Sequence, residues 1–419
     1  MHSNRRWWIR PLLLVAGAAW IALAWLALRV PKDAEATPSY ARRYGTDCQT
    51  CHSPNPPRLN NVGMVFRRSG FRLPDADESG KLTLKNLPAQ TIGEAMTIAG
   101  QIDGNIVQHP DPGMSKSSFL LSEVELIAGT SIGDHYSTQM MFIPYNDEAA
   151  SELEDLEAQA NFGPPESQFI VRGGKMQPLV WQKAGHGSMT PSSPLILDES
   201  SPAPIGDFAG PGLSHMLAGM EVGYMATRLH KGHLTSTMVS VSAMNGFNPD
   251  GSDARTHPGD GVDILAQATE LIGSRNTANA FYYKGHTVID PEGALPTPGP
   301  FRDEFTRYGV TGNFAPMDRI DLAAGYAGGE NKSEELARTV KTKGYYGEVT
   351  GTIMPGWVAT YRYDHVDPDT DTSDDAISDH VLGTTYLLQS TVFLSAEYRE
   401  IQLGSAKSHG ILGRIRLLY

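Results

Sequence analysis

From about residue 95 onward, apolar side chains alternate with polar or small ones in segments of roughly 8 to 13 residues. The stretches 96–106 and 119–129 are examples, and turn-rich clusters separate successive segments. Including a weaker candidate at 156–162, the segments number 16. A period of two places alternate side chains on opposite faces of a strand. Strands with one apolar and one polar face, in this number, predict an all-β transmembrane barrel of about 16 antiparallel strands.

The unequal connections between segments support this interpretation. Short turns such as 133–135 alternate with longer polar stretches such as 245–260 and 290–303, as expected for short periplasmic turns and longer extracellular loops. An alternating segment also ends on an aromatic residue, Tyr419. A soluble β-sandwich or propeller would alternate in the same way. The long segments and the terminal aromatic residue favour a barrel surrounded by the lipid of a Gram-negative outer membrane.

Residues 1–36 predict export from the cytoplasm. Arg5, Arg6 and Arg10 make the start basic. The apolar stretch 11–30 follows, and then Ala34-Glu35-Ala36, which has the form of a signal-peptide cleavage site. An uncleaved anchor is the alternative, because about 20 apolar residues are enough to cross a bilayer. In either case the rest of the chain lies outside the cytoplasm.

The formal net charge is −13. Residues 1–36 carry five basic and two acidic residues, so their removal changes the charge to −16. Such an acidic surface argues against nucleic acid as a partner and is compatible with metal cations or basic redox proteins. The sequence has no nucleophile motif, glycine-rich phosphate loop or H-E-x-x-H motif. It therefore gives no support to a hydrolase or a nucleotide-dependent enzyme.

The only two cysteines of the chain form a C-x-x-C-H motif over Cys48–His52. This grouping is typical of covalent c-type haem attachment, in which both thiols bind the haem and the histidine becomes the proximal iron ligand. A zinc site would need a second pair of ligands, and a thioredoxin-like dithiol would need a βαβ context. The sequence therefore predicts one covalent haem c, with Cys48 and Cys51 as its anchors and His52 on the iron.

These features divide the chain into three predicted parts. Residues 1–36 form the signal peptide, residues 37–87 a small α-helical cytochrome c segment with its linker, and residues 88–419 the barrel. Within the middle part, residues 60–71 predict a short helix, and the polar, glycine-containing residues 75–87 predict the linker. A segment of this size rarely folds alone, so we expect the haem and the barrel to hold it in place.

Basic residues gather around the haem motif. They are Arg42, Arg43, Arg58, Arg67 and Arg68. One interpretation is that they balance the haem propionates and the carboxylates of an acidic lumen, and the alternative is a solvated basic face. In the predicted barrel, Lys175 is a further basic residue that we expect to point into the lumen.

Two stretches of the haem segment resemble a known family. Residues 38–52 contain an aromatic-Ala-Arg opening before the C-x-x-C-H motif, and residues 57–74 contain P-x-L-x-x-x-G-x-x-F-x-x-x-G-aromatic. This order is similar to that of the fused outer-membrane monohaem cytochrome c–porins, which include the iron oxidases of neutrophilic and acidophilic bacteria. The matching residues make up less than a tenth of the chain. The resemblance implies a haem segment joined to a porin-like barrel, with Fe(II) oxidase activity.

The distal iron ligand is left open by the sequence. Met64 lies 12 residues after His52, and a helix that folds back could present its sulfur to the iron. The alternative is that Met64 packs among the apolar residues of the same helix. Met96 and His109, early in the barrel, are two further candidates, and the haem could also lack a second protein ligand.

The leading hypothesis is an outer-membrane electron carrier that oxidises extracellular Fe(II), or another redox-active metal. Its acceptor would be a periplasmic cytochrome c or a similar carrier. No catalytic side chain is needed beyond the haem ligands. Two alternatives are outward electron transfer to extracellular acceptors, and a porin whose haem segment is a plug or sensor.

Overall fold

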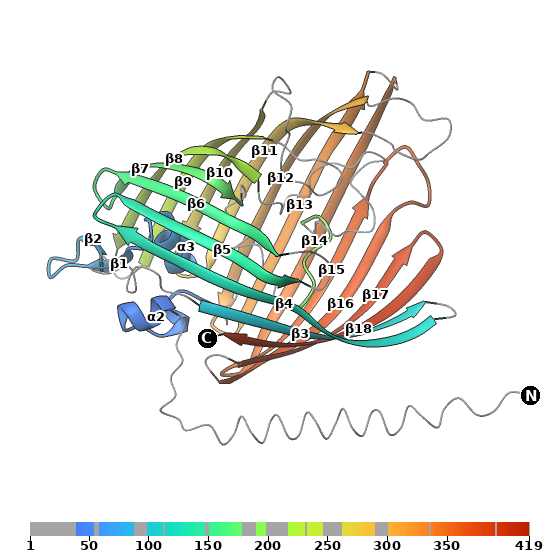
Figure 1. Ribbon diagram of the computed structural model, residues 1–419, viewed down its shortest axis with the longest axis horizontal. Coiled ribbons are helices and arrows are strands. Elements are labelled where there is room, and N and C mark those ends of the chain that lie inside the picture. Colours follow the sequence, from blue (N-terminus) through green and yellow to red (C-terminus); the bar gives the residue numbers. More distant parts are fainter. Residues whose placement is uncertain are drawn as a thin grey trace, which may run out of the picture.

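The computed structural model is a closed β-barrel with a small helical segment at one end (Figure 1). It describes residues 39–53, 58–87, 99–111, 114–146, 151–177, 190–197, 217–230, 233–245, 262–289, 301–334, 337–389 and 392–418. The predicted signal peptide, Met96 and Tyr419 lie outside these ranges. Within them, no helix is both long and apolar enough to cross a membrane.

Sixteen antiparallel strands form the barrel, and the last of them, β18, pairs with the first, β3. They are β3 (Ala99–Asp111), β4 (Met114–Ile132), β5 (Tyr136–Asn146), β6 (Glu152–Phe162), β7 (Ser167–Met176), β8 (Leu217–His230), β9 (His233–Met244), β10 (Asp263–Ile272), β11 (Asn276–Ile289), β12 (Phe301–Met317), β13 (Ile320–Ser333), β14 (Arg338–Met354), β15 (Trp357–Asp367), β16 (Ile377–Gln389), β17 (Val392–Leu403) and β18 (Ala406–Leu418). The predicted fold class is confirmed, and the weaker candidate at 156–162 belongs to β6. Closure leaves no open strand edge.

The alternation along the strands gives the barrel a polar inner face and an apolar outer face. In β9, Ser240 and Ser242 are buried toward the lumen, whereas the exposed Val239 and Val241 face outward. Strand β10 alternates in the same strict way over its whole length. A closed barrel with an apolar outer face satisfies its backbone internally and matches lipid. The chain is therefore an outer-membrane β-barrel.

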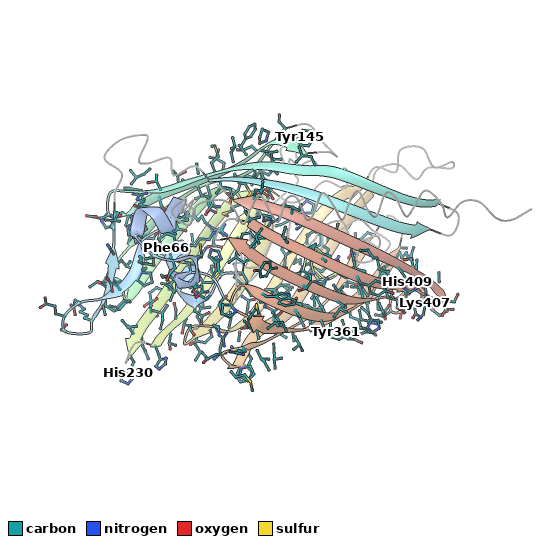
Figure 2. The ribbon with its side chains drawn as sticks, turned by 90° about the horizontal axis from the view of Figure 1, so that it is seen from below. Phe66, Tyr145, His230, Tyr361, Lys407 and His409 are labelled. Carbon is teal, nitrogen blue, oxygen red and sulfur yellow. The ribbon has the colours of Figure 1, made fainter. Side chains whose placement is uncertain are left out.

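The two ends of the barrel differ. Connections after β4, β6, β8, β10, β12, β14 and β16 are two to four residues long, whereas those at the other end reach 40 residues, at 177–216. The short-turn end is thus the periplasmic one. Figure 2 shows Phe66 of the helical segment and His230 at this end, and Lys407 and His409 at the opposite end.

Part of the long β7–β8 connection folds into the lumen. Residues 190–197 are held by the fully buried Arg362 of β15, whose guanidinium donates hydrogen bonds to Thr190 Oγ1 (2.7 Å) and the Ser192 carbonyl (2.8 Å). Leu195, Ile196 and Leu197 pack against the inner wall in a core cluster that includes Phe281 and Phe305. The lumen of the described barrel is therefore partly filled by its own chain.

The prediction that Lys175 points into the lumen is wrong. Lys175 pairs with Leu156, whose side chain is exposed on the outer face. The next position along β7, Met176, is fully buried on the inner face, as is Arg172 four residues before it. Successive side chains of a strand point to opposite faces, so the place of Lys175 in β7 determines its face. This alternation outweighs the preference of a charged side chain for a polar lumen.

The helical segment comprises α2 (Ser39–Tyr44), a 3-10 turn η1 (Cys48–Thr50) and α3 (Asn61–Arg68). The predicted helix at 60–71 corresponds to α3 and is shorter than expected. A hairpin of β1 (Leu73–Ala76) and β2 (Leu82–Lys85) follows it. The predicted linker at 75–87 is thus largely a hairpin, closed by Asp77, whose carboxylate accepts hydrogen bonds from Ser79 and the Lys81 amide.

The outer face predicts how substitutions affect stability. Val239 lies at the middle of β9 and faces outward, so Val239→Arg places a charge within the apolar band. We expect it to lower the free energy of unfolding by about 2–4 kcal/mol, as at a bilayer midplane. Leu403→Arg, at the extracellular end of β17, is the matched control and should cost about 1 kcal/mol or less. Urea titration of the barrel refolded in lipid vesicles measures both, and equal losses would contradict the orientation.

Candidate functional site

The C-x-x-C-H motif folds into one tight turn. The Cys51 and His52 amides both donate to the Cys48 carbonyl, at 3.2 and 2.9 Å. The chain then returns antiparallel to itself, with a bridge between His52 and Leu59. Cys48, Cys51 and His52 all line the same cavity. The three predicted haem residues therefore come together as attachment of a single haem would require.

Asn60 joins this turn to helix α3. Its side-chain oxygen caps the helix by accepting from the Gly63 amide at 3.0 Å, and its Nδ2 donates to the Gln49 and Thr50 carbonyls at 3.1 and 3.0 Å. Gly63 sits directly against the Cys51 carbonyl, where any Cβ would collide with backbone. The glycine of the motif therefore lets α3 lie on the haem-attachment turn, which a larger residue would push away.

Four aromatic rings form the core of the helical segment. Tyr40 stacks on Phe71, with ring centroids 5.1 Å apart, and Phe66 meets Tyr40 and Tyr44 edge to face at 5.1 and 5.5 Å. The Tyr44 hydroxyl donates to the Phe71 carbonyl at 2.6 Å. Phe71 adopts a positive φ of 60°, which is uncommon outside glycine and follows Gly70 at φ 68°. This double left-handed bend turns the Phe71 ring back onto the cluster.

A cavity of about 260 Å³ lies between the helical segment and the barrel wall. Cys48, Cys51 and His52 line one side of it, and Ile127 of β4 and Met141 of β5 line the other. The four aromatic residues also contribute to its walls. An apolar pocket with thiols and an imidazole on one wall is suited to a flat, largely apolar cofactor.

Met64 is not on the wall of this cavity. It is buried against the barrel in a cluster with Val65, Ile170, Met225 and Met238. This position matches the alternative of simple packing and does not favour the prediction of iron ligation. The other two candidates cannot be placed, because Met96 and the side chain of His109 lie outside the described residues.

The polar groups of the cavity fit a haem with its propionates. The Tyr40 hydroxyl is buried without a hydrogen-bond partner and lies against Gly129, where a side chain would take its space. Burial raises the pKa of Tyr40 far above its usual range, so the phenol remains a donor. Arg67 also lines the cavity, with its guanidinium 3.7 Å from the Asp155 carboxylate. Both groups could donate hydrogen bonds to a carboxylate of the cofactor.

Burial also controls the two thiols. It raises the pKa of Cys51 to about 11, helped by the neighbouring Cys48, and it raises the pKa of Cys48 as well. Since the thiolate is the reactive form of cysteine, the docked segment keeps both side chains unreactive at neutral pH. Haem attachment is thus expected before the segment docks in the barrel.

Buried ion pairs connect the helical segment to the lumen wall. Arg58 pairs with Glu348 of β14, and Arg68 pairs with Glu221 of β8; all four side chains are almost fully buried. Glu221 also accepts from Arg172 of β7 at 3.1 Å. The carboxylates of the lumen are therefore partners of the arginines, and the alternative of a solvated basic face is wrong for Arg58 and Arg68.

Hydrogen bonds fix the same segment to the periplasmic rim. Asn61 Nδ2 donates to the Gly273 and Asn276 carbonyls, both at 2.9 Å, and Arg72 donates to the Gly133 carbonyl at 3.0 Å. On α2, Arg43 donates to Thr130 of β4 at 3.0 Å. The contacts at β4, β8 and β14 are four, six and six strands apart around the ring. The segment is thus a plug held from three sides in the periplasmic mouth.

Several of these residues were not found from the sequence. Glu221 and Glu348 occupy lumen-facing positions of alternating strands. From the sequence, this pattern indicates a polar interior, but it does not identify the arginine with which each glutamate pairs. The alternation of β5 likewise places Met141 on the inner face of the barrel, without indicating which residues it would meet. The side chain of Arg42 lies outside the described residues, so its predicted role is untested.

Comparison with solved structures finds similar barrels. A loop L8 deletion mutant of OmpT, an outer membrane protein of Vibrio cholerae, has a TM-score of 0.53 and 13% identity over 77% of this chain and 98% of its own. An anion-selective porin from Comamonas acidovorans has 0.52 and 12% over 77% and 98%. OmpF of Salmonella typhi with daunomycin has 0.52 and 11% over 77% and 97%. No protein-family profile and no curated protein matches the sequence. At such identities the likeness shows a porin-like fold.

The ion pair between Arg58 and Glu348 of β14 predicts how firmly the helical segment is held in the barrel. Glu348→Ala leaves the Arg58 guanidinium buried without its carboxylate, which typically costs about 3–5 kcal/mol. We expect residues 39–87 to become protease-sensitive at lower urea concentration, while the barrel stays intact. Lys81→Ala is the control, because its pair with Glu166 (3.6 Å) is exposed and should contribute little. A similar response of both variants would argue against the buried pair as a docking contact.

The thiol pKa predicts reactivity in haem-free protein. A pKa of about 11 leaves roughly one Cys51 thiol in a thousand ionised at pH 8, against about a quarter for an ordinary cysteine. Alkylation of Cys51 in the folded protein should be about two hundredfold slower than in urea. Its rate should rise tenfold per pH unit up to about pH 11. Mass spectrometry of iodoacetamide-treated protein measures this, and a plateau near pH 8.5 would show that the thiol is not buried.

Proposed function

We propose that the protein carries electrons across the outer membrane, from extracellular Fe(II) to a periplasmic cytochrome c or a similar carrier. One observation carries the proposal: a C-x-x-C-H motif lines an apolar cavity between the wall of an outer-membrane barrel and the plug held in its periplasmic mouth. The cytochrome c–porin resemblance of residues 38–74 supports it. When bound, haem c supplies one-electron redox chemistry at its iron.

Each residue of the site has a distinct role in this proposal. Cys48 and Cys51 would form the thioether bonds, and His52 would bind the iron as the proximal ligand. Tyr40 and Arg67 would bind the propionates. The turn that presents these ligands is held rigid by Asn60 and the close approach of α3, so the binding geometry would be prepared by the plug itself.

The position of the plug supports a separate approach for each of the two proposed partners. Bound at the periplasmic rim, the cofactor would be within reach of a carrier protein that docks on the short turns. The electron donor would approach from the extracellular side, and the net charge of −13 of the whole chain would favour a metal cation over an anion. The electron balance is simple: one Fe(II) becomes one Fe(III), and one carrier molecule is reduced by one electron.

The alternative is a transport function, in which the protein is a porin and its haem segment is a plug or sensor. Two features of the lumen weigh against an open channel: the plug is bonded at β4, β8 and β14, and residues 190–197 are clamped by Arg362. Outward electron transfer would use the same site, and only the potentials of the haem and its partners separate it from the proposed direction.

The test is the visible spectrum of intact cells that carry the protein in the outer membrane. Adding Fe(II) should produce the bands of a reduced c-type haem, and these bands should be absent in a Cys51→Ala variant. If dithionite produces the bands and Fe(II) does not, iron oxidation is ruled out and outward transfer becomes the better explanation. Conductance of the purified protein in planar bilayers, without Fe(II)-dependent reduction, would instead favour a porin.

A further inference from the structure

We propose that Met141 of β5 is the distal iron ligand, so that the haem is held between the plug and the barrel wall. This inference rests on the proposed haem attachment and adds to it the identity of the sixth ligand. Met141 lines the same cavity as the attachment turn, from the barrel wall, and is 8% exposed. Thioether sulfur is an established haem ligand opposite histidine.

The backbone around Met141 is irregular on both sides. The register with β6 shifts between Met141 and Phe142, where Glu154 of β6 is the extra residue, and the register with β4 shifts between Phe142 and Tyr145. Such bulges re-aim a side chain and are frequent beside functional sites. Two of them occur within residues 141–145 of β5, the strand that contributes Met141 to the cavity wall.

Three other polar side chains of the described cavity wall are less suited to iron. The Tyr44 hydroxyl donates to the Phe71 carbonyl, and Gln139 donates to Asp155 at 2.8 Å. Tyr40 remains protonated because its pKa is strongly raised by burial, whereas iron-bound tyrosine is a phenolate. Met64, the ligand suggested by the sequence, packs on the barrel side of α3. Among these side chains, Met141 is the one that both lines the cavity and carries a sulfur ligand suited to iron.

Ligation by Met141 would join two parts of the chain. His52 belongs to the plug and Met141 to the barrel, so the iron would cross-link them in the folded protein. Methionine also raises the reduction potential of a histidine-ligated haem, which suits an acceptor of electrons from Fe(II). Docking of the plug and the reduction potential of the haem would then depend on the same bond, between the Met141 sulfur and the iron.

The test compares three variants of the purified holoprotein: Met141→Leu, Met64→Leu and, as a matched buried control in the wall cluster, Met225→Leu. In the oxidised wild type we expect a low-spin spectrum with the sulfur-to-iron charge-transfer band. Met141→Leu should lose this band, become high-spin and bind carbon monoxide when reduced. Met64→Leu and Met225→Leu should retain it. Met141→His should restore a low-spin haem and lower the potential.

Three results would overturn the inference. They are an unchanged spectrum in Met141→Leu, loss of the band in Met64→Leu instead, and a wild-type haem that is already five-coordinate. Each of these leaves haem attachment intact. Failure of the proposed function is recognised separately, because the denatured wild-type protein would then carry no covalent haem.

Discussion

Buried charge between the plug and the lumen wall is the constraint on which the site depends. Arg58 and Arg68 are removed from water together with Glu348 and Glu221. Taking such ions out of water costs several kcal/mol each, so the arrangement is favourable only when the partners meet with good geometry. A displaced plug would separate Arg58 from Glu348 and Arg68 from Glu221, and of the two carboxylates Glu221 would keep its pair with Arg172 of β7. The ion pairs therefore select one docked position, and that position places the cavity against β4 and β5.

The barrel was largely predictable because its signal is local. A two-residue period fixes which side chains face lipid, as in Val239 and Val241, and the number of segments then gives 16 strands. The turn of Cys48–His52 was predictable for the same reason, since a short motif defines its own ligands. Structure that is determined by neighbours along the chain can be obtained from one sequence.

The remainder depends on contacts between distant residues. The hairpin at 73–85 has the polar composition of a linker, and it is stabilised by its Asp77 turn and its place on the rim. The position of Met64 depends on which side of α3 meets the barrel, and the sequence of α3 has apolar residues on both sides. The pairing of Arg58 with Glu348 has no local signature, because the two residues are 290 positions apart.

That separation affects how the protein folds. Contacts of such high contact order form late, since the loop between the partners must first be closed. The residues that pair with the plug lie on strands made after it, and Glu348 is among the last third of the chain. Until β7 to β10 are in place, Met64 and Val65 of α3 have no surface to cover them. During export and assembly, the N-terminal segment would therefore expose apolar side chains of the kind that periplasmic chaperones bind.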